Sequence, residues 1–126
     1  MIEIEKITPN IGARIHGVDL STCKTEDLKK VYQALIDHQV VFFDNQRISP
    51  DQQLSLAKFF GDLEPAHPFF PRVESTPQVS IIETTNGNAP LESYWHTDLT
   101  WRENPSKGAI LHAKHVPDAG GDTIWV

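Results

Sequence analysis

His96 and Asp98 are the two residues of this chain whose types and spacing best suit a metal ion. Side chains two positions apart point to the same side of an extended strand, whereas on a helix they lie about 200° apart. Together they supply two of the three ligands of the two-His, one-carboxylate triad that holds non-haem Fe(II) and leaves positions open for oxygen. Taken alone, such a pair is more often an ordinary hydrogen bond on a surface strand. No obvious third ligand follows before Val126.

Two later histidines do not complete the triad by spacing. His112 and His115 are three residues apart in an expected strand, where such residues face opposite sides. We expect them to face solvent or to pack singly. If two ligands do bind a metal, the third has to come from His67, His112, His115 or a neighbouring subunit.

Composition narrows the class of protein. The 126 residues are 39% hydrophobic and 22% charged, as in an ordinary soluble globular domain. A net charge of −6 without a basic cluster argues against binding to nucleic acid or to an anionic membrane surface. The longest strongly apolar run, residues 40–43, is too short to span a membrane. An acidic N-terminus and a single cysteine predict a cytoplasmic protein in a reducing compartment.

The first half of the chain predicts strands and two helices. Alternating apolar residues indicate short strands over residues 2–5 and 13–16, and the run 40–43 is typical of a buried strand. Helical spacing of apolar residues predicts an amphipathic helix over residues 25–38, with Thr25 as its N-cap. Ser49-Pro50-Asp51-Gln52 predicts the start of a second helix, which Gly61 ends.

The second half predicts mainly strands and loops. Four prolines in residues 65–77 favour an irregular loop, and a second loop is expected over 86–90. Strands are expected over residues 79–84, 108–116 and 122–126, with a turn at 117–121. This order indicates an α+β domain with a β-sandwich or barrel core. A strand at the very end of the chain leaves an unpaired edge, so we expect a truncated domain.

Several segments in order carry a resemblance to a known family. The chain resembles the taurine dioxygenase (TauD/TfdA) family in seven segments. Three lie in the second half, at Tyr94–Trp101, Gly108–Leu111 and Gly120–Trp125. Four lie in the first half, at Ile11–Ala13, Gly17–Leu20, His38–Phe43 and Pro50–Gln53. These proteins are Fe(II)- and 2-oxoglutarate-dependent oxygenases. The resemblance implies a double-stranded β-helix, a jelly-roll of the clavaminate-synthase-like type with flanking helices. Residues 1–126 would then be the N-terminal part of one such domain.

The resemblance also implies roles for individual residues. His96 and Asp98 match two iron ligands, and Thr123 matches the threonine that hydrogen-bonds the distal carboxylate of 2-oxoglutarate. Three residues match the substrate pocket: His67, Phe70 and Leu99. Phe70 stands where the taurine enzyme has a tyrosine, and Glu92 falls about where it has an asparagine, so taurine itself is a poor fit. His67 has the alternative role of capping its proline-rich loop.

Two functions of different classes follow. The first is a dioxygenase that uses O₂ and 2-oxoglutarate to hydroxylate a small organic acid of the taurine or alkylsulfonate class, through an iron(IV)-oxo oxidant with release of succinate and CO₂. Aromatic residues near His96 and Asp98 would exclude water from the pocket around the iron. The second is a truncated, inactive fragment that acts in binding or assembly, with exposed strand edges that favour a homo-oligomer. A zinc hydrolase is a distant third, because further ligands are not arranged for it.

Overall fold

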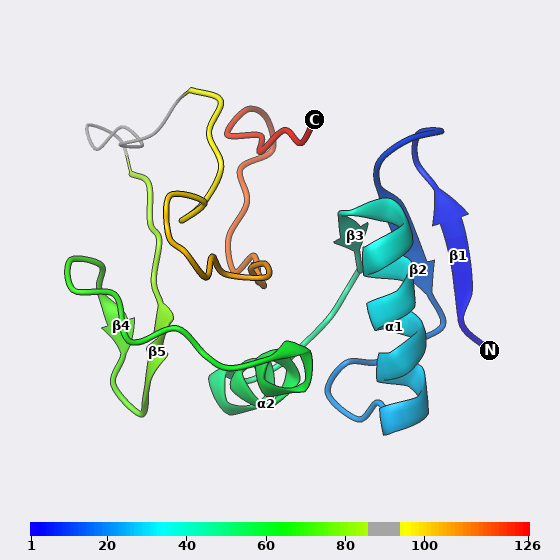
Figure 1. Cartoon of the computed structure of the whole chain (residues 1–126), viewed down its shortest axis with the longest axis horizontal. Coiled ribbons are helices and arrows are strands. Elements are labelled where there is room, and N and C mark those ends of the chain that lie inside the picture. The colour runs from blue at the N-terminus through cyan, green and yellow to red at the C-terminus, as the bar shows by residue number, and fades with distance from the viewer. Residues whose placement is uncertain (86–93) are drawn as a thin grey trace. The chain divides into compact units, whose positions relative to one another are not determined.

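Residues 1–85 and 94–126 are described by a computed structural model in which the chain divides into two units (Figure 1). The terminal unit is formed by Met1–Gln52 together with Leu111–Val126, and the central unit by Gln53–Ile110. Within this described part, no helix has the length and apolar character needed to cross a membrane.

A three-stranded sheet and one helix form the terminal unit. Strands β1 (Glu3–Lys6) and β2 (Ala13–His16) are antiparallel, with Ile4 paired to Ile15. Strand β3 (Val41–Phe42) pairs with β2 in parallel, so β2 lies in the centre of the sheet. Side chains alternate along β2, since Ala13 and Ile15 are buried whereas Arg14 is exposed. The predicted strands 2–5 and 13–16 are therefore confirmed to within a residue. The run 40–43 forms only the two-residue strand β3, which lies at the edge of the sheet with Phe42 38% exposed, so the prediction that it is buried is wrong.

Helix α1 (Thr25–His38) covers this sheet (Figure 1). Its bounds confirm the predicted helix, but the N-cap is Lys24 rather than Thr25, because Thr25 already belongs to the helix. The helix buries Val31 and Ala34, which form the core of the unit together with Ala13, Ile15 and Ile48. Two carbonyls at and just beyond the end of the helix bond the start of β2. Gly12 N donates to His38 O at 2.9 Å, and Ala13 N donates to Val40 O, two residues beyond the helix, at 3.0 Å.

Helix α2 (Pro50–Phe60) begins where the capping signal predicts. Gln52 N donates to Ser49 Oγ at 3.2 Å, and Ser49 N donates to Gln52 Oε1 at 2.8 Å, so both side chains satisfy backbone groups at the helix start. Gly61 follows the last helical residue, as predicted.

Removal of this cap gives a prediction for stability. Ser49→Ala leaves the Gln52 N–H without its acceptor and should lower the free energy of unfolding by about 1 kcal/mol. Urea denaturation followed by circular dichroism measures the change. Ser55→Ala, within the same helix, is the matched control and should change stability by less than about 0.5 kcal/mol. Equal losses in the two variants would contradict the assignment of Ser49 as the cap.

A hairpin in the central unit corrects the sequence prediction. Strands β4 (Arg72–Val73) and β5 (Thr76–Ser80) are antiparallel, where an irregular loop was expected up to residue 77 and a strand only from residue 79. The prolines that favour a loop over residues 65–77 include Pro77, which lies within β5. In a two-stranded sheet each strand has an open edge, and proline is tolerated where no ladder donor is needed.

Three further strand predictions are wrong. Residues 108–116 and 122–126 have no regular secondary structure, and neither does the segment around His96. A strand forms only where its N–H and C=O groups bond a neighbouring strand, and these segments have no such neighbour in the described residues. The expected loop 86–90 and Glu92 lie outside the described residues. The coarse α+β class therefore holds, but residues 1–85 and 94–126 do not form the strands of a jelly-roll.

Candidate metal centre

The structure brings the side chains of His96 and Asp98 together in the central unit. His96 Nε2 lies 3.4 Å from Asp98 Oδ1. Both side chains remain accessible, with exposed fractions of 40% and 71%. The prediction that the two side chains lie close together is confirmed. The strand from which it was argued does not form in this segment.

A backbone contact determines which tautomer the neutral His96 ring adopts. His96 Nδ1 lies 2.9 Å from the carbonyl oxygen of Tyr94, and a carbonyl can only accept. In the neutral ring the proton is therefore on Nδ1, and Nε2 presents a lone pair toward Asp98. A hydrogen bond from the ring nitrogen that does not bind the metal is the usual way in which proteins orient a metal-binding histidine.

The donor pair fits a divalent metal ion. Two ligand atoms about 2.1 Å from one ion, at an angle of about 90–110°, lie about 3.0–3.4 Å apart. The observed 3.4 Å falls in this range, and an imidazole with a carboxylate is a donor set suited to Fe(II). Among residues 1–85 and 94–126, no third His, Cys, Asp or Glu joins them in a group that could hold a metal.

A tight turn follows Asp98. Leu99 has a φ of 55°, in the left-handed region, which costs a residue with a branched side chain about 1 kcal/mol. The turn is closed by Arg102 N, which donates to Leu99 O at 3.1 Å, and by the hydroxyls of Thr97 and Thr100, which lie 2.6 Å apart. This turn sets the direction in which Asp98 leaves the backbone. Leu99 itself is half-buried, and its expected role in the substrate pocket stays a prediction.

Glu64 connects this turn to the residues that follow α2. Arg102 Nη1 donates to Glu64 Oε2 at 2.7 Å, and Ser106 Oγ donates to Glu64 Oε1 at 2.7 Å. These two hydrogen bonds lower the pKa of Glu64 below its ordinary value of 4.5. Sequence reasoning missed this contact, because residues 38 and 42 positions apart carry no local signal of pairing.

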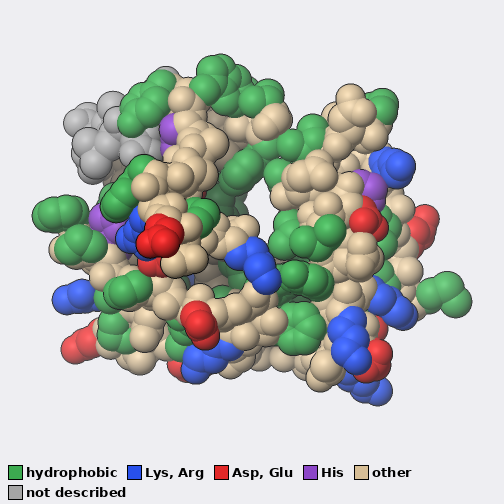
Figure 2. Space-filling model, viewed as in Figure 1, with side chains coloured by type: hydrophobic (Ala, Val, Ile, Leu, Met, Phe, Trp, Pro, Cys, Tyr) green, Lys and Arg blue, Asp and Glu red, His purple; other side chains and the backbone are tan. Residues whose placement is uncertain are grey.

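The aromatic residues expected around the His96–Asp98 pair do not enclose it. Tyr94, Trp95 and Trp101 are 65%, 68% and 80% exposed, and Figure 2 shows hydrophobic side chains spread over the visible surface. Phe70 is 37% exposed. The expected dry pocket is therefore not formed by these residues, because no other described segment covers them.

His67 caps its own loop, which was the alternative to a substrate contact. Its Nδ1 accepts hydrogen bonds from the backbone N–H groups of Phe69 and Phe70, each at 3.2 Å. The ring stacks on Phe70 with centroids 4.2 Å apart. Since Nδ1 accepts, the neutral ring carries its proton on Nε2, which is left as the donor that could meet an acidic group. A substrate role for His67 and Phe70 stays a prediction.

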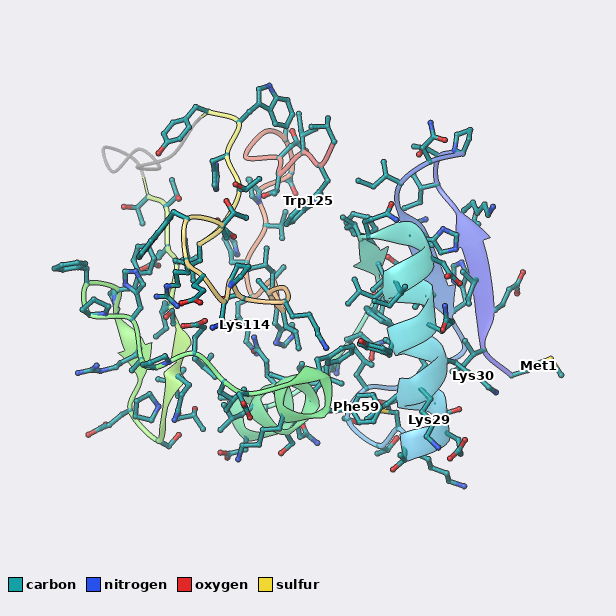
Figure 3. All side chains as sticks on the ribbon, viewed as in Figure 1. Met1, Lys29, Lys30, Phe59, Lys114 and Trp125 are labelled. Atoms are coloured by element: carbon teal, nitrogen blue, oxygen red, sulfur yellow. The ribbon has the colours of Figure 1, made fainter. Side chains whose placement is uncertain are left out.

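Thr123 lies in the other unit, in a cleft of about 430 Å³ that β3 and the chain end both line. The cleft is mostly apolar, and Trp125, labelled in Figure 3, is one of its walls. Asp122 and the hydroxyls of Thr8 and Thr123 are its polar side chains. Thr123 and the His96–Asp98 pair belong to different units.

Comparison with known proteins decides the family. The family model described as "Taurine catabolism dioxygenase TauD, TfdA family" matches residues 3–126. The chain belongs to the TauD/TfdA family. The resemblance inferred from its motifs is thereby confirmed over almost the whole chain.

Individual proteins are similar to this chain over part of their length. An alkylsulfatase of Acinetobacter baylyi is 31% identical across 98% of this chain and 39% of its own. An alpha-ketoglutarate-dependent sulfate ester dioxygenase of Pseudomonas putida is 35% identical across 98% of this chain and 41% of its own. The crystal structure of a taurine dioxygenase from Burkholderia xenovorans superposes with a TM-score of 0.69 at 33% identity, covering 82% of this chain and 37% of that one. The chain thus spans about two fifths of the length of these relatives.

Proposed function

We propose that this chain supplies the iron-binding, N-terminal part of a 2-oxoglutarate-dependent dioxygenase domain with the double-stranded β-helix fold. The observation that carries the proposal is the pairing of His96 Nε2 with Asp98 Oδ1 at 3.4 Å, with the opposite ring nitrogen held by a carbonyl. Membership of the TauD/TfdA family supports the same assignment. Fe(II) bound there would supply the oxygen chemistry with 2-oxoglutarate as co-substrate.

The chain's own residues have limited tasks in this proposal. His96 and Asp98 hold the metal, and the turn at Leu99 keeps the carboxylate directed at the imidazole. Thr123 would donate its hydroxyl to the distal carboxylate of 2-oxoglutarate. His67, with its proton on Nε2, would donate to the acidic group of the substrate, while the ring of Phe70 holds the imidazole in place.

We propose an organic sulfate or sulfonate as the substrate class. The alkylsulfatase and the sulfate ester dioxygenase support this class, because both match nearly all of this chain. Phe70 supports a substrate with an apolar alkyl chain beside it, since its ring has no hydroxyl to bond a polar group.

The proposed function is tested by succinate formation. Two ligands bind Fe(II) weakly, so the 126-residue chain with Fe(II), 2-oxoglutarate, O₂ and an alkyl sulfate should release little succinate. A chimera in which residues 1–126 replace the matched part of the Pseudomonas putida enzyme should release succinate only when an alkyl sulfate or sulfonate is present.

Two results would contradict these proposals. Rapid turnover by the 126-residue chain alone would mean that a third ligand is already at hand. A folded chimera that binds 2-oxoglutarate but ignores every sulfate and sulfonate would contradict the substrate class. Phenoxypropionate is the comparison substrate, because a dioxygenase for it from Delftia acidovorans is also 29% identical to this chain.

A further inference from the structure

Glu64 is the only link, among the described side-chain hydrogen bonds, between the turn after Asp98 and the segment that follows α2. Each of its two carboxylate oxygens has a separate donor, Arg102 at 2.7 Å and Ser106 at 2.7 Å. The two donors lie four and eight residues after Asp98. One carboxylate therefore holds Arg102, the last residue of the turn, and also Ser106, four residues further along the chain.

The connection from Glu64 to the metal pair is continuous. The Arg102 N–H closes the turn on the carbonyl of Leu99, which directly follows Asp98. The hydroxyls of Thr97 and Thr100 lie 2.6 Å apart across the same turn. A change in the position of Arg102 is thus passed to the backbone that carries Asp98.

Two hydrogen bonds hold the segment after Arg102 against α2. Lys107 Nζ donates to the carbonyl of Phe60, the last residue of the helix, at 3.2 Å. Gln53 Nε2, from the first half of the helix, donates to Ile110 O at 3.0 Å. The segment 102–110 is consequently held along α2, and Glu64 joins its start to the chain just beyond the helix end.

We propose that Glu64 is a positioning residue for the metal centre. Through Arg102 and Ser106 it holds the left-handed turn at Leu99, and so keeps Asp98 Oδ1 within reach of a metal ion on His96 Nε2. The proposal rests on the proposed function, because it requires His96 and Asp98 to be ligands. An ion pair with exposed fractions of 37% and 44% adds little to global stability, so its main effect is local geometry.

The test measures metal affinity by a method that works for weak binding. Mn(II) is titrated into the ¹⁵N-labelled 126-residue chain, and paramagnetic broadening of the amide signals of residues 95–102 gives a dissociation constant. Glu64→Gln should weaken Mn(II) binding by about threefold or more, with an unchanged unfolding temperature. Asp44→Asn is the matched control, since Asp44 forms a similarly exposed ion pair with Arg14 at 3.3 Å in the other unit.

A charge-swapped variant separates positioning from a general structural effect. Glu64→Arg combined with Arg102→Glu restores an ion pair at the same place and should recover part of the lost affinity. Wild-type affinity in Glu64→Gln, or an equal loss in Asp44→Asn, would overturn the proposal. No recovery in the swapped variant would overturn it as well.

One more variant distinguishes this proposal from the one on which it rests. Asp98→Asn removes a ligand charge and should abolish the broadening near residues 95–102. If Asp98→Asn binds Mn(II) as the unmodified chain does, the metal assignment itself fails. If Asp98→Asn loses binding while Glu64→Gln does not, only the role of Glu64 fails.

Discussion

Alanine at His96 or Asp98 is expected to remove metal binding from this chain altogether. Each side chain provides one of two ligand atoms that lie 3.4 Å apart, and one remaining ligand cannot hold a divalent ion against water. Mn(II) should then leave the amide signals of residues 95–102 as sharp as in the metal-free sample. In a protein that contains the complete domain, both variants should lose substrate-dependent succinate formation.

The control for this prediction is another histidine of the same chain. His115→Ala removes an exposed imidazole that is outside the pair, and it should leave Mn(II) binding unchanged. Normal turnover by His96→Ala or Asp98→Ala in the complete domain would contradict the metal centre. Loss of binding in His115→Ala would mean that the ion uses a ligand other than those assigned.

The largest expected change in stability comes from Ile15. Its side chain is 2% exposed in the centre of the sheet, under α1. Ile15→Ala removes buried methyl and methylene groups and leaves a cavity, so it should lower the free energy of unfolding by about 2–4 kcal/mol. Equilibrium unfolding in urea, followed by circular dichroism, measures this loss.

Ile4 is a matched control because it is the direct cross-strand partner of Ile15. It is 43% exposed on the edge strand, so Ile4→Ala should cost less than about 1 kcal/mol. Similar losses for the two variants would show that the core does not lie beneath α1. A small loss for Ile15→Ala would have the same meaning.

The features predicted correctly from sequence are those with local causes. Helix α1 follows from the spacing of its apolar residues, and α2 from Ser49, Pro50 and Gln52, all of which act within one or two turns. The proximity of His96 and Asp98 depends only on a separation of two residues. The two side chains come together although no strand forms, with His96 Nε2 3.4 Å from Asp98 Oδ1.

The features that were missed depend on distant partners. Residues 108–116 have a strand pattern, but a strand needs a neighbour, and the relatives contain more than twice the length of chain matched here. The contact of Glu64 with Arg102 joins residues 38 positions apart, and a charged pair at that separation has no sequence signature. The four prolines of residues 65–77 favour a loop, yet β5 includes Pro77, because the sequence does not say which edge of a hairpin stays open.

The alternation in β2 sets where this chain can be lengthened. One inserted residue inside Ala13–His16 would shift the remaining side chains to the opposite face, and would bring Arg14 or its neighbour from solvent into the core. The two residues between β4 and β5 form a turn, in which side chains do not alternate between two faces. Extra residues there can extend into solvent without changing which side chains either strand buries. A peptide tag or reporter loop is therefore best inserted between Glu74 and Ser75, where it leaves the strand register and the buried faces unchanged.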